Sequence, residues 1–198
     1  AEIGKMTGLT LLDLTSNRFS GPLPEEIGRL IHLRSLLLSE NEFSGELPET
    51  LGNLINLRNF YVKTNRLSGP FPVVLTKLVK LEYLNLSFNN FSGTIPAEIG
   101  NWEELKHLYL WKNQFSGSIP PSIGKLRNLT ELSLGENRLS GELPKELGQL
   151  ENLVTAYLNN NAFTGQIPNE MTRASNLKYL NLNSNNLSGD LPDELGNW

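Results

Sequence analysis

The chain repeats itself every 24 residues, and this period constrains its fold more than any other feature. One asparagine returns in each repeat: Asn17, Asn41, Asn65, Asn89, Asn113, Asn137, Asn161 and Asn185. Glycine keeps the same register from Gly21 to Gly189, and no insertion interrupts the series. Such regularity predicts a solenoid, in which each repeat forms one coil and packs on its neighbours. We therefore expect residues 1–198 to form a single domain of about eight coils.

Each coil contains a short segment of alternating apolar residues, with leucine at positions 1, 4 and 6 when the asparagine is position 9. Leu129, Leu132 and Leu134 are an example. This alternation predicts a strand with one buried side, and stacked coils place such strands in parallel about 4.8 Å apart. The asparagine amide carries a donor and an acceptor, so we expect it to bond backbone groups of its own coil and of the next, in a continuous ladder.

Position 11 is apolar in every coil and predicts a column of core residues along the stack. Its members are Phe19, Phe43, Leu67, Phe91, Phe115, Leu139, Phe163 and Leu187. Trp102 and Trp198 stand where other coils carry a core leucine, so both tryptophans are predicted to be buried.

Composition excludes several classes of partner and site. A net charge of −4 with mixed signs argues against nucleic acid and anionic membranes, since both attract a concentrated cationic face. No apolar stretch has the length of a membrane span. The absence of cysteine excludes disulfides, thiolate catalysis and cysteine-ligated metal. With only His32 and His107 as imidazoles and with scattered carboxylates, we expect no metal and no cofactor.

The repeat, written LxxLxLxxNxFSGxIPxxIGxLxxL, resembles the plant-type leucine-rich repeat over essentially the whole chain. It looks most like the ectodomains of plant receptor-like kinases and receptor-like proteins, and polygalacturonase-inhibiting proteins are also similar. The resemblance implies an α/β solenoid: a curved superhelix of 24-residue coils whose parallel β-sheet lines the concave face. It also implies a location outside the cell or at its surface, and a role in recognition.

The two ends depart from the pattern of that family. Its ectodomains usually carry flanking caps with paired cysteines, whereas this chain begins with AEIGKMTGL and stops with DELGNW. An uncapped solenoid exposes its apolar interior. We therefore expect self-association through the end coils, or excision from a longer protein, with these residues exposed: Ile3, Met6, Leu191, Leu195 and Trp198.

The variable positions 3, 5, 7 and 8 should point away from the core and are the candidate ligand-binding surface. Aromatic residues concentrate there in the third to fifth coils, with charged residues at the edge and Tyr157 further along position 5. The candidate ligand-binding residues are Tyr61, Lys63, Tyr83, Phe88, His107, Tyr109, Trp111, Lys112, Glu131 and Tyr157, with Glu136 beside them. Such aromatic clusters are typical of binding hot spots. The alternative is that these rings only cover the sheet by cross-strand packing.

Catalysis is not expected from this surface. His107 beside Glu131 suggests acid–base chemistry, but the sequence places no serine, threonine or second histidine to complete a triad, and an open sheet excludes no water. We therefore predict that the chain is not an enzyme.

Four asparagines lie in glycosylation sequons: Asn85, Asn90, Asn128 and Asn186. This composition gives roughly three such triplets by chance, so the sequons are weak evidence for secretion. A glycan on Asn85 would stand between Tyr61 and Tyr109 and obstruct the aromatic surface.

The leading hypothesis is a non-catalytic recognition module that holds an extended peptide or protein on its concave sheet. Inhibition of a cell-wall hydrolase is one alternative, and a structural or engineered solenoid that assembles through its ends is another. The resemblance implies a pair of arginines where ligands present a free carboxylate, and positions 3, 5, 7 and 8 contain no arginine.

Overall fold

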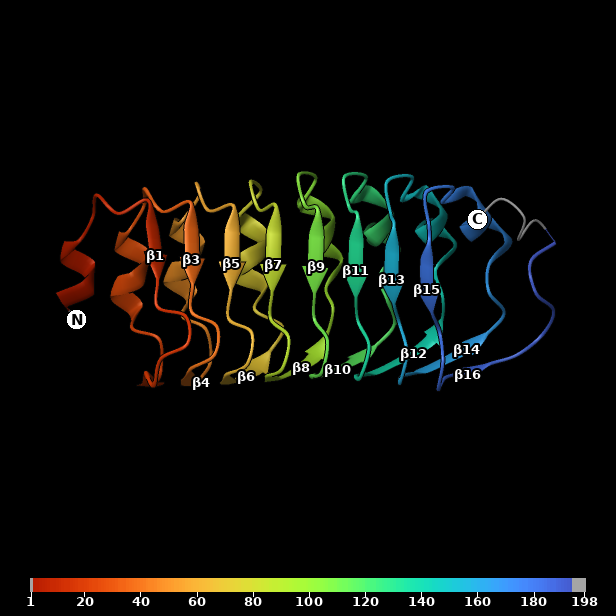
Figure 1. Ribbon diagram of the computed structural model, residues 1–198, viewed down its shortest axis with the longest axis horizontal. Coiled ribbons are helices and arrows are strands. Elements are labelled where there is room, and N and C mark those ends of the chain that lie inside the picture. The colour runs from red at the N-terminus through yellow and green to blue at the C-terminus, as the bar shows by residue number, and fades with distance from the viewer. Residues whose placement is uncertain (1, 194–198) are drawn as a thin grey trace.

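The computed structural model describes residues 2–193, which form a stack of similar coils along one long axis (Figure 1). In each coil a short strand is followed by a second short strand and a 3₁₀-helix. The first strands lie side by side in one parallel sheet: β1 (Leu11–Asp13), β3 (Ser35–Leu37), β5 (Asn59–Tyr61), β7 (Tyr83–Asn85), β9 (His107–Tyr109), β11 (Glu131–Ser133), β13 (Thr155–Tyr157) and β15 (Tyr179–Asn181). This confirms the predicted parallel sheet. We call its side away from the core the strand face.

A second parallel sheet, which the sequence did not predict, runs along another side of the stack (Figure 1). Its strands are β2 (Ser20–Gly21), β4 (Glu42–Gly45), β6 (Arg66–Pro70), β8 (Asn90–Thr94), β10 (Gln114–Gly117), β12 (Arg138–Glu142), β14 (Ala162–Gly165) and β16 (Asn186–Leu187). The segment after the asparagine therefore also forms backbone pairs between coils. Gly21, for example, pairs with Phe43.

The third side of each coil is a 3₁₀-helix, and residues 2–193 contain no α-helix. The helices are η1 (Glu2–Lys5), η2 (Glu25–Arg29), η3 (Glu49–Asn53), η4 (Val73–Lys77), η5 (Ala97–Asn101), η6 (Pro121–Lys125), η7 (Lys145–Gln149) and η8 (Asn169–Arg173). From η2 onward a proline stands directly before each helix, as Pro24 stands before η2. Its ring fixes φ and lacks an N–H, which suits the residue that starts a helical turn.

The core is one continuous cluster that contains the leucines of the strands and most of the position-11 column. Trp102 is fully buried, and its Nε1 donates to the Leu75 carbonyl at 3.0 Å, as its core position predicts. The prediction for Phe19 is wrong, because its side chain is 46% exposed and only its stacking on Phe43 covers it. Leu187, at the other end of the column, is half-buried. A column member is buried only where a coil packs on each side of it.

The asparagine ladder is present along the stack. Asn89 shows the pattern: its Nδ2 donates to the carbonyls of Val62, Leu86 and Ser87 at 2.9, 3.1 and 3.2 Å. Its Oδ1 accepts the Leu67 backbone N–H at 3.0 Å. Each such amide therefore joins its own coil to the preceding one. The predicted ladder is present, but its direction is the reverse of the prediction, which had the amide bond the next coil.

The residue before each of these asparagines adopts a left-handed backbone. The φ angles at this position 8 lie between 51° and 57°, and none of the eight residues is glycine, among them Phe88 and Lys112. A side chain there costs roughly 1 kcal/mol. The cost is offset by backbone bonds to the next coil, such as Phe88 N–H to the Trp111 carbonyl at 2.9 Å.

Apolar side chains are exposed at both ends of the described stack. Met6 is 50% exposed and Leu191 is 67% exposed, as predicted, whereas Ile3 is half-buried against the core. Leu195 and Trp198 lie outside the described residues.

Candidate functional site

The register of the first sheet brings the predicted aromatic residues together on the strand face. Strand pairing sets Tyr83 beside His107 and His107 beside Glu131. The side chains of these strands on the strand face border a hollow of about 600 Å³. Its lining residues are Tyr61, Lys63, Tyr83, Asn85, Ser87, Phe88, His107, Tyr109, Trp111, Glu131, Ser133 and Tyr157. Of the predicted site residues only Lys112 is not in the lining, and it lies against Phe88. Ser87 and Ser133 also line the hollow, and the sequence analysis missed them because it selected aromatic and charged residues.

A hydrogen-bonded cluster lies at one end of the hollow. The Tyr109 hydroxyl donates to Glu131 Oε2 at 2.7 Å, and His107 Nδ1 lies 2.9 Å from the same hydroxyl oxygen. The His107 ring stacks on Tyr83 with centroids 4.6 Å apart. Because the single Tyr109 proton goes to the carboxylate, His107 Nδ1 must carry a proton and donate to the Tyr109 oxygen. The cluster therefore fixes three side chains and one imidazole tautomer.

Thr130 is a hydroxyl residue that lies beside His107, on the neighbouring coil. Its Oγ1 is 3.5 Å from His107 Nε2 and donates to the Lys106 carbonyl at 3.0 Å. Because the hydroxyl proton already has a backbone acceptor, Thr130 is not arranged as a nucleophile that His107 could deprotonate. The sequence signal was the position of Thr130 directly before Glu131, which begins the strand that pairs with His107.

Two tyrosines of the hollow have perturbed acidity. Burial, together with the hydrogen bond to the Glu131 carboxylate, holds the pKa of Tyr109 well above its usual range. Burial, with a smaller contribution from Tyr83, also raises the pKa of Tyr61. Both phenols are therefore neutral donors at physiological pH.

Replacing Glu131 with glutamine is expected to lower the pKa of Tyr109 towards the ordinary tyrosine value, because the phenolate no longer faces a negative charge. Absorbance of the phenolate during an alkaline titration measures this, and Tyr109→Phe identifies the transition. Since the folded pKa is raised, the associated stability is present below about pH 10, the unfolded pKa, and is lost as pH rises through the folded value. An unchanged titration in Glu131→Gln would refute the assigned proton.

The other end of the hollow carries two cations against one ring. Lys63 Nζ and Lys112 Nζ lie 5.6 and 5.3 Å from the centre of the Phe88 ring. Glu136 Oε2 is 4.0 Å from Lys112 Nζ, which is a loose pair between exposed side chains. Trp111 links this end to Tyr157, with ring centroids 5.9 Å apart. The charged rim predicted around the aromatic residues is therefore positive at this end.

Trp111 also carries an unsatisfied donor. Its Nε1 is buried and has no hydrogen-bond partner among the described residues. An indole nitrogen can only donate, so the missing partner is an acceptor. A buried group left in this state costs roughly 1–3 kcal/mol.

The four sequons occupy different environments. Asn90, Asn128 and Asn186 are exposed, whereas Asn85 is half-buried in the hollow, where its Oδ1 accepts the Ser87 N–H at 3.0 Å. Asn128 Nδ2 donates to the Glu103 carbonyl at 2.8 Å, a bond that a glycan on this nitrogen would disturb.

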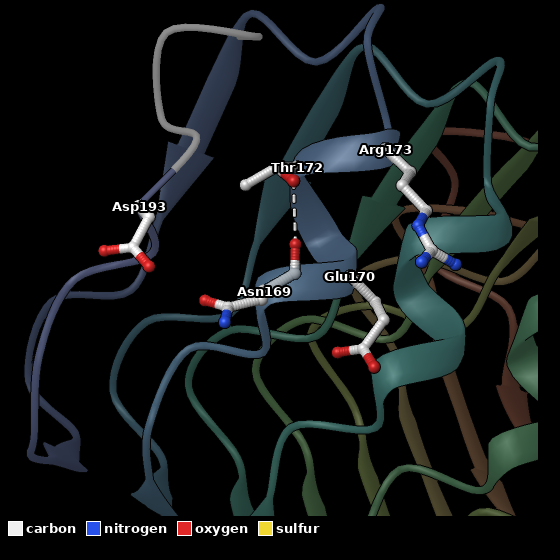
Figure 2. A pocket seen from close by; sticks show the side chains of 5 residues that line it. All are labelled: Asn169, Glu170, Thr172, Arg173 and Asp193. Atoms are coloured by element: carbon white, nitrogen blue, oxygen red, sulfur yellow. Dashed lines mark hydrogen bonds between the residues drawn. The ribbon is translucent and has the colours of Figure 1, made fainter.

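A smaller depression of about 230 Å³ lies at the far end of the stack beside η8 (Figure 2). Thr172 Oγ1 donates to the Asn169 carbonyl at 2.7 Å there, and Asp193 lies across from Asn169. Residues 194–198 follow Asp193 directly and lie outside the described range, so this depression carries no functional assignment. Within residues 2–193, no three histidine or carboxylate side chains are placed to hold a metal ion. None of the helices in that range is long and apolar enough to cross a membrane.

Comparison with known proteins agrees with this architecture. The model of the Leucine Rich Repeat family matches residues 8–30, 32–54, 80–102, 104–126, 128–150 and 176–198. No curated protein sequence matches the chain.

Several solved structures resemble the chain over nearly its whole length. The ectodomain of the Arabidopsis thaliana receptor kinase GASSHO1/SCHENGEN3, in complex with CASPARIAN STRIP INTEGRITY FACTOR 2, is 39% identical with a TM-score of 0.97. The Arabidopsis HAESA ectodomain, in complex with an IDA peptide hormone ligand, is 40% identical with a TM-score of 0.94. Both alignments cover 98% of this chain, which spans 23% of the first protein and 33% of the second.

A plant ice-binding protein, 24% identical over 91% of this chain and 74% of its own, shares only the fold, with a TM-score of 0.68. The family matches, the parallel sheets and the coil period agree. The chain therefore belongs to the leucine-rich repeat family and is similar over nearly its whole length to ectodomains of plant receptor kinases.

Proposed function

We propose that the chain is a non-catalytic recognition module that binds a peptide or protein ligand on the strand face, which we take as the concave side of an extracellular solenoid. The observation that carries this proposal is the aromatic hollow, to which five consecutive coils contribute. Rings with polar tips lose little conformational freedom on binding, and a cluster of them is the usual centre of a binding surface.

The polarity of the hollow suggests how a ligand would lie. Glu131 and Tyr109 are already bonded to each other, so this end is preorganised. At the other end Lys63 and Lys112 present ammonium groups, and the Lys112–Glu136 pair is loose, with 4.0 Å between Nζ and Oε2. An extended peptide that offers backbone carbonyls there would satisfy these donors while its side chains cover the rings.

The solved relatives support a ligand of this class. The GASSHO1/SCHENGEN3 ectodomain was crystallised with CASPARIAN STRIP INTEGRITY FACTOR 2, and the HAESA ectodomain with a peptide hormone. We extend to this chain only the binding of a peptide or protein. The proposed absence of catalysis rests on the open hollow and on the Thr130 hydroxyl, whose proton has a backbone acceptor.

The combined substitution Tyr109→Ala and Trp111→Ala is expected to abolish ligand binding, by at least a hundredfold, with little change in the thermal unfolding midpoint. Binders would first be selected on the unmodified protein from a displayed library of random peptides. Calorimetric titration of those peptides then compares the variants.

Tyr179→Ala is the matched control, because Tyr179 is a tyrosine of the same sheet, 63% exposed and outside the hollow. Its binding should equal that of the unmodified protein. A large loss of stability in the double variant with unchanged binding would mean that the rings only cover the sheet.

A further inference from the structure

Three consecutive coils carry an exposed apolar side chain at the same place, position 23, in the turn between the 3₁₀-helix and the next strand. Ile31 is 47% exposed, Ile55 is 58% exposed and Val79 is 52% exposed. These turns form one long edge of the stack (Figure 1). Since neighbouring coils lie about 4.8 Å apart, the three side chains form one strip, which we call the apolar edge strip.

The repeat itself does not require apolar residues at this position. The following coils have Glu103, Arg127, Glu151 and Ser175 at position 23. The adjacent backbone is held in the same way in both groups: Asn56 Nδ2 donates to the Ile31 carbonyl at 3.1 Å, and Asn152 Nδ2 donates to the Arg127 carbonyl at 2.8 Å. Single exposed apolar side chains are ordinary on protein surfaces, but three at the same position of consecutive coils are not explained by the fold.

The same three coils carry mainly basic residues beside the strip. His32 and Lys80 occupy position 24, and Arg34 and Arg58 occupy position 2. Lys80 Nζ reaches back to Asn56 Oδ1 at 2.8 Å, so its charge lies next to Ile55. Positions 21 to 24 of these coils contain no acidic residue, although the whole chain has a net charge of −4.

Carboxylates border the strip on the side of the fourth coil. Glu103 and Glu104 occupy positions 23 and 24 there, next to Val79 and Lys80. Glu82 accepts hydrogen bonds from Lys106 Nζ, at 2.7 Å, and from Arg58, and these bonds lower its pKa. The border of the strip is therefore positive around Ile31 and Ile55, on an otherwise acidic molecule.

We propose that the apolar edge strip and its basic border form a docking surface for a second protein, whose matching surface has carboxylates around an apolar centre. An apolar centre with a charged rim is the usual arrangement of a protein interface, and opposite charges on the two rims steer the partners together. A stable contact of this kind buries about 800 Å² on each side, so the basic border must take part.

Two other occupants fit the edge less well. A second copy that docks by the same strip would set Arg34 and Lys80 against the same residues of its partner, and like charges at an interface oppose association. An anionic membrane would favour aromatic anchors at such an edge, and the strip consists only of isoleucine and valine. None of the residues of the strip or its basic border lines the aromatic hollow, so the docking proposal stands independently of the proposed ligand.

Site-directed photocrosslinking tests the surface in the full-length protein in the cells that make it. A photoreactive phenylalanine analogue replaces Ile55 in one variant and Glu151 in the other, since Glu151 occupies the same coil position outside the strip. We expect the Ile55 probe, and not the Glu151 probe, to crosslink one protein at a segment rich in aspartate and glutamate. That protein is then purified, and its affinity is measured by surface plasmon resonance.

Ile55→Asp and Arg34→Glu are each expected to weaken this binding by tenfold or more, whereas Glu151→Lys leaves it within twofold. Added salt should weaken it as well, because the rim charges are screened. The unfolding midpoint should not change, since all three side chains are exposed. A crosslink to lipid or to a second copy would overturn the proposal. So would equal or absent crosslinking from the two probes, or binding that ignores Arg34→Glu.

Discussion

Replacing Asn89 with alanine is expected to lower the free energy of unfolding by about 3–4 kcal/mol. The amide is 8% exposed and makes four hydrogen bonds to backbone groups of two coils. Alanine leaves the buried Leu67 N–H without its acceptor and removes one of the two amide hydrogen bonds to the Val62 carbonyl, which keeps only the bond from Asn65 Nδ2. Urea unfolding followed by circular dichroism gives the difference directly.

Asn90→Ala is the control for this experiment, because the next residue is also an asparagine but is exposed. It should change the free energy of unfolding by less than about 0.5 kcal/mol. Equal effects of the two substitutions would show that the ladder does not hold the coils together.

Gly148→Ala is expected to destabilise the fold by about 3 kcal/mol, because the new methyl group has no room. A β-carbon on Gly148 would lie 1.9 Å from the carbonyl oxygen of Glu170, which belongs to η8. That atom is backbone, so the two 3₁₀-helices would have to separate. Thermal unfolding measures the loss, and hydrogen exchange should show it first in η7 and η8.

The effect depends on the local approach of the two helices and not on the coil position. Thr76 occupies the same position in the third coil and is buried without difficulty. Gly8→Ala is the matched control, since nothing lies within 4 Å of its β-carbon position. A Gly148→Ala variant as stable as Gly8→Ala would mean that η7 and η8 do not pack this closely in solution.

The strands, the ladder and most of the core could be predicted from the sequence, because each depends on one residue type that recurs at one position. Asn89 and its counterparts can satisfy neighbouring backbone only from that place in the coil. Phe19 shows the limit of the method. Phe19 and Phe43 are the same residue type at the same coil position. Their burial differs because it depends on the coils packed on either side, and the residue type does not specify this.

The remaining features depend on geometry between coils. The second sheet pairs Gly21 with Phe43, an offset of 22 residues that a period of 24 does not suggest. The backbone at position 8 is left-handed even at Phe88 and Lys112, and neither residue type predicts a positive φ angle. Of the candidate site, the grouping of rings follows from the register. The Tyr109–Glu131 bond and the contact of Thr130 with His107 depend on side-chain rotamers.

The register of the first sheet has a consequence for how such a surface can change over generations. Residues pair at a constant spacing of 24, as Tyr61 with Asn85 and Asn85 with Tyr109. Loss of one whole repeat from a gene would bring Tyr61 beside Tyr109 with the pairing intact. Unequal recombination could therefore change which aromatic side chains lie together on the strand face, one repeat at a time, while the packing of the core stays the same.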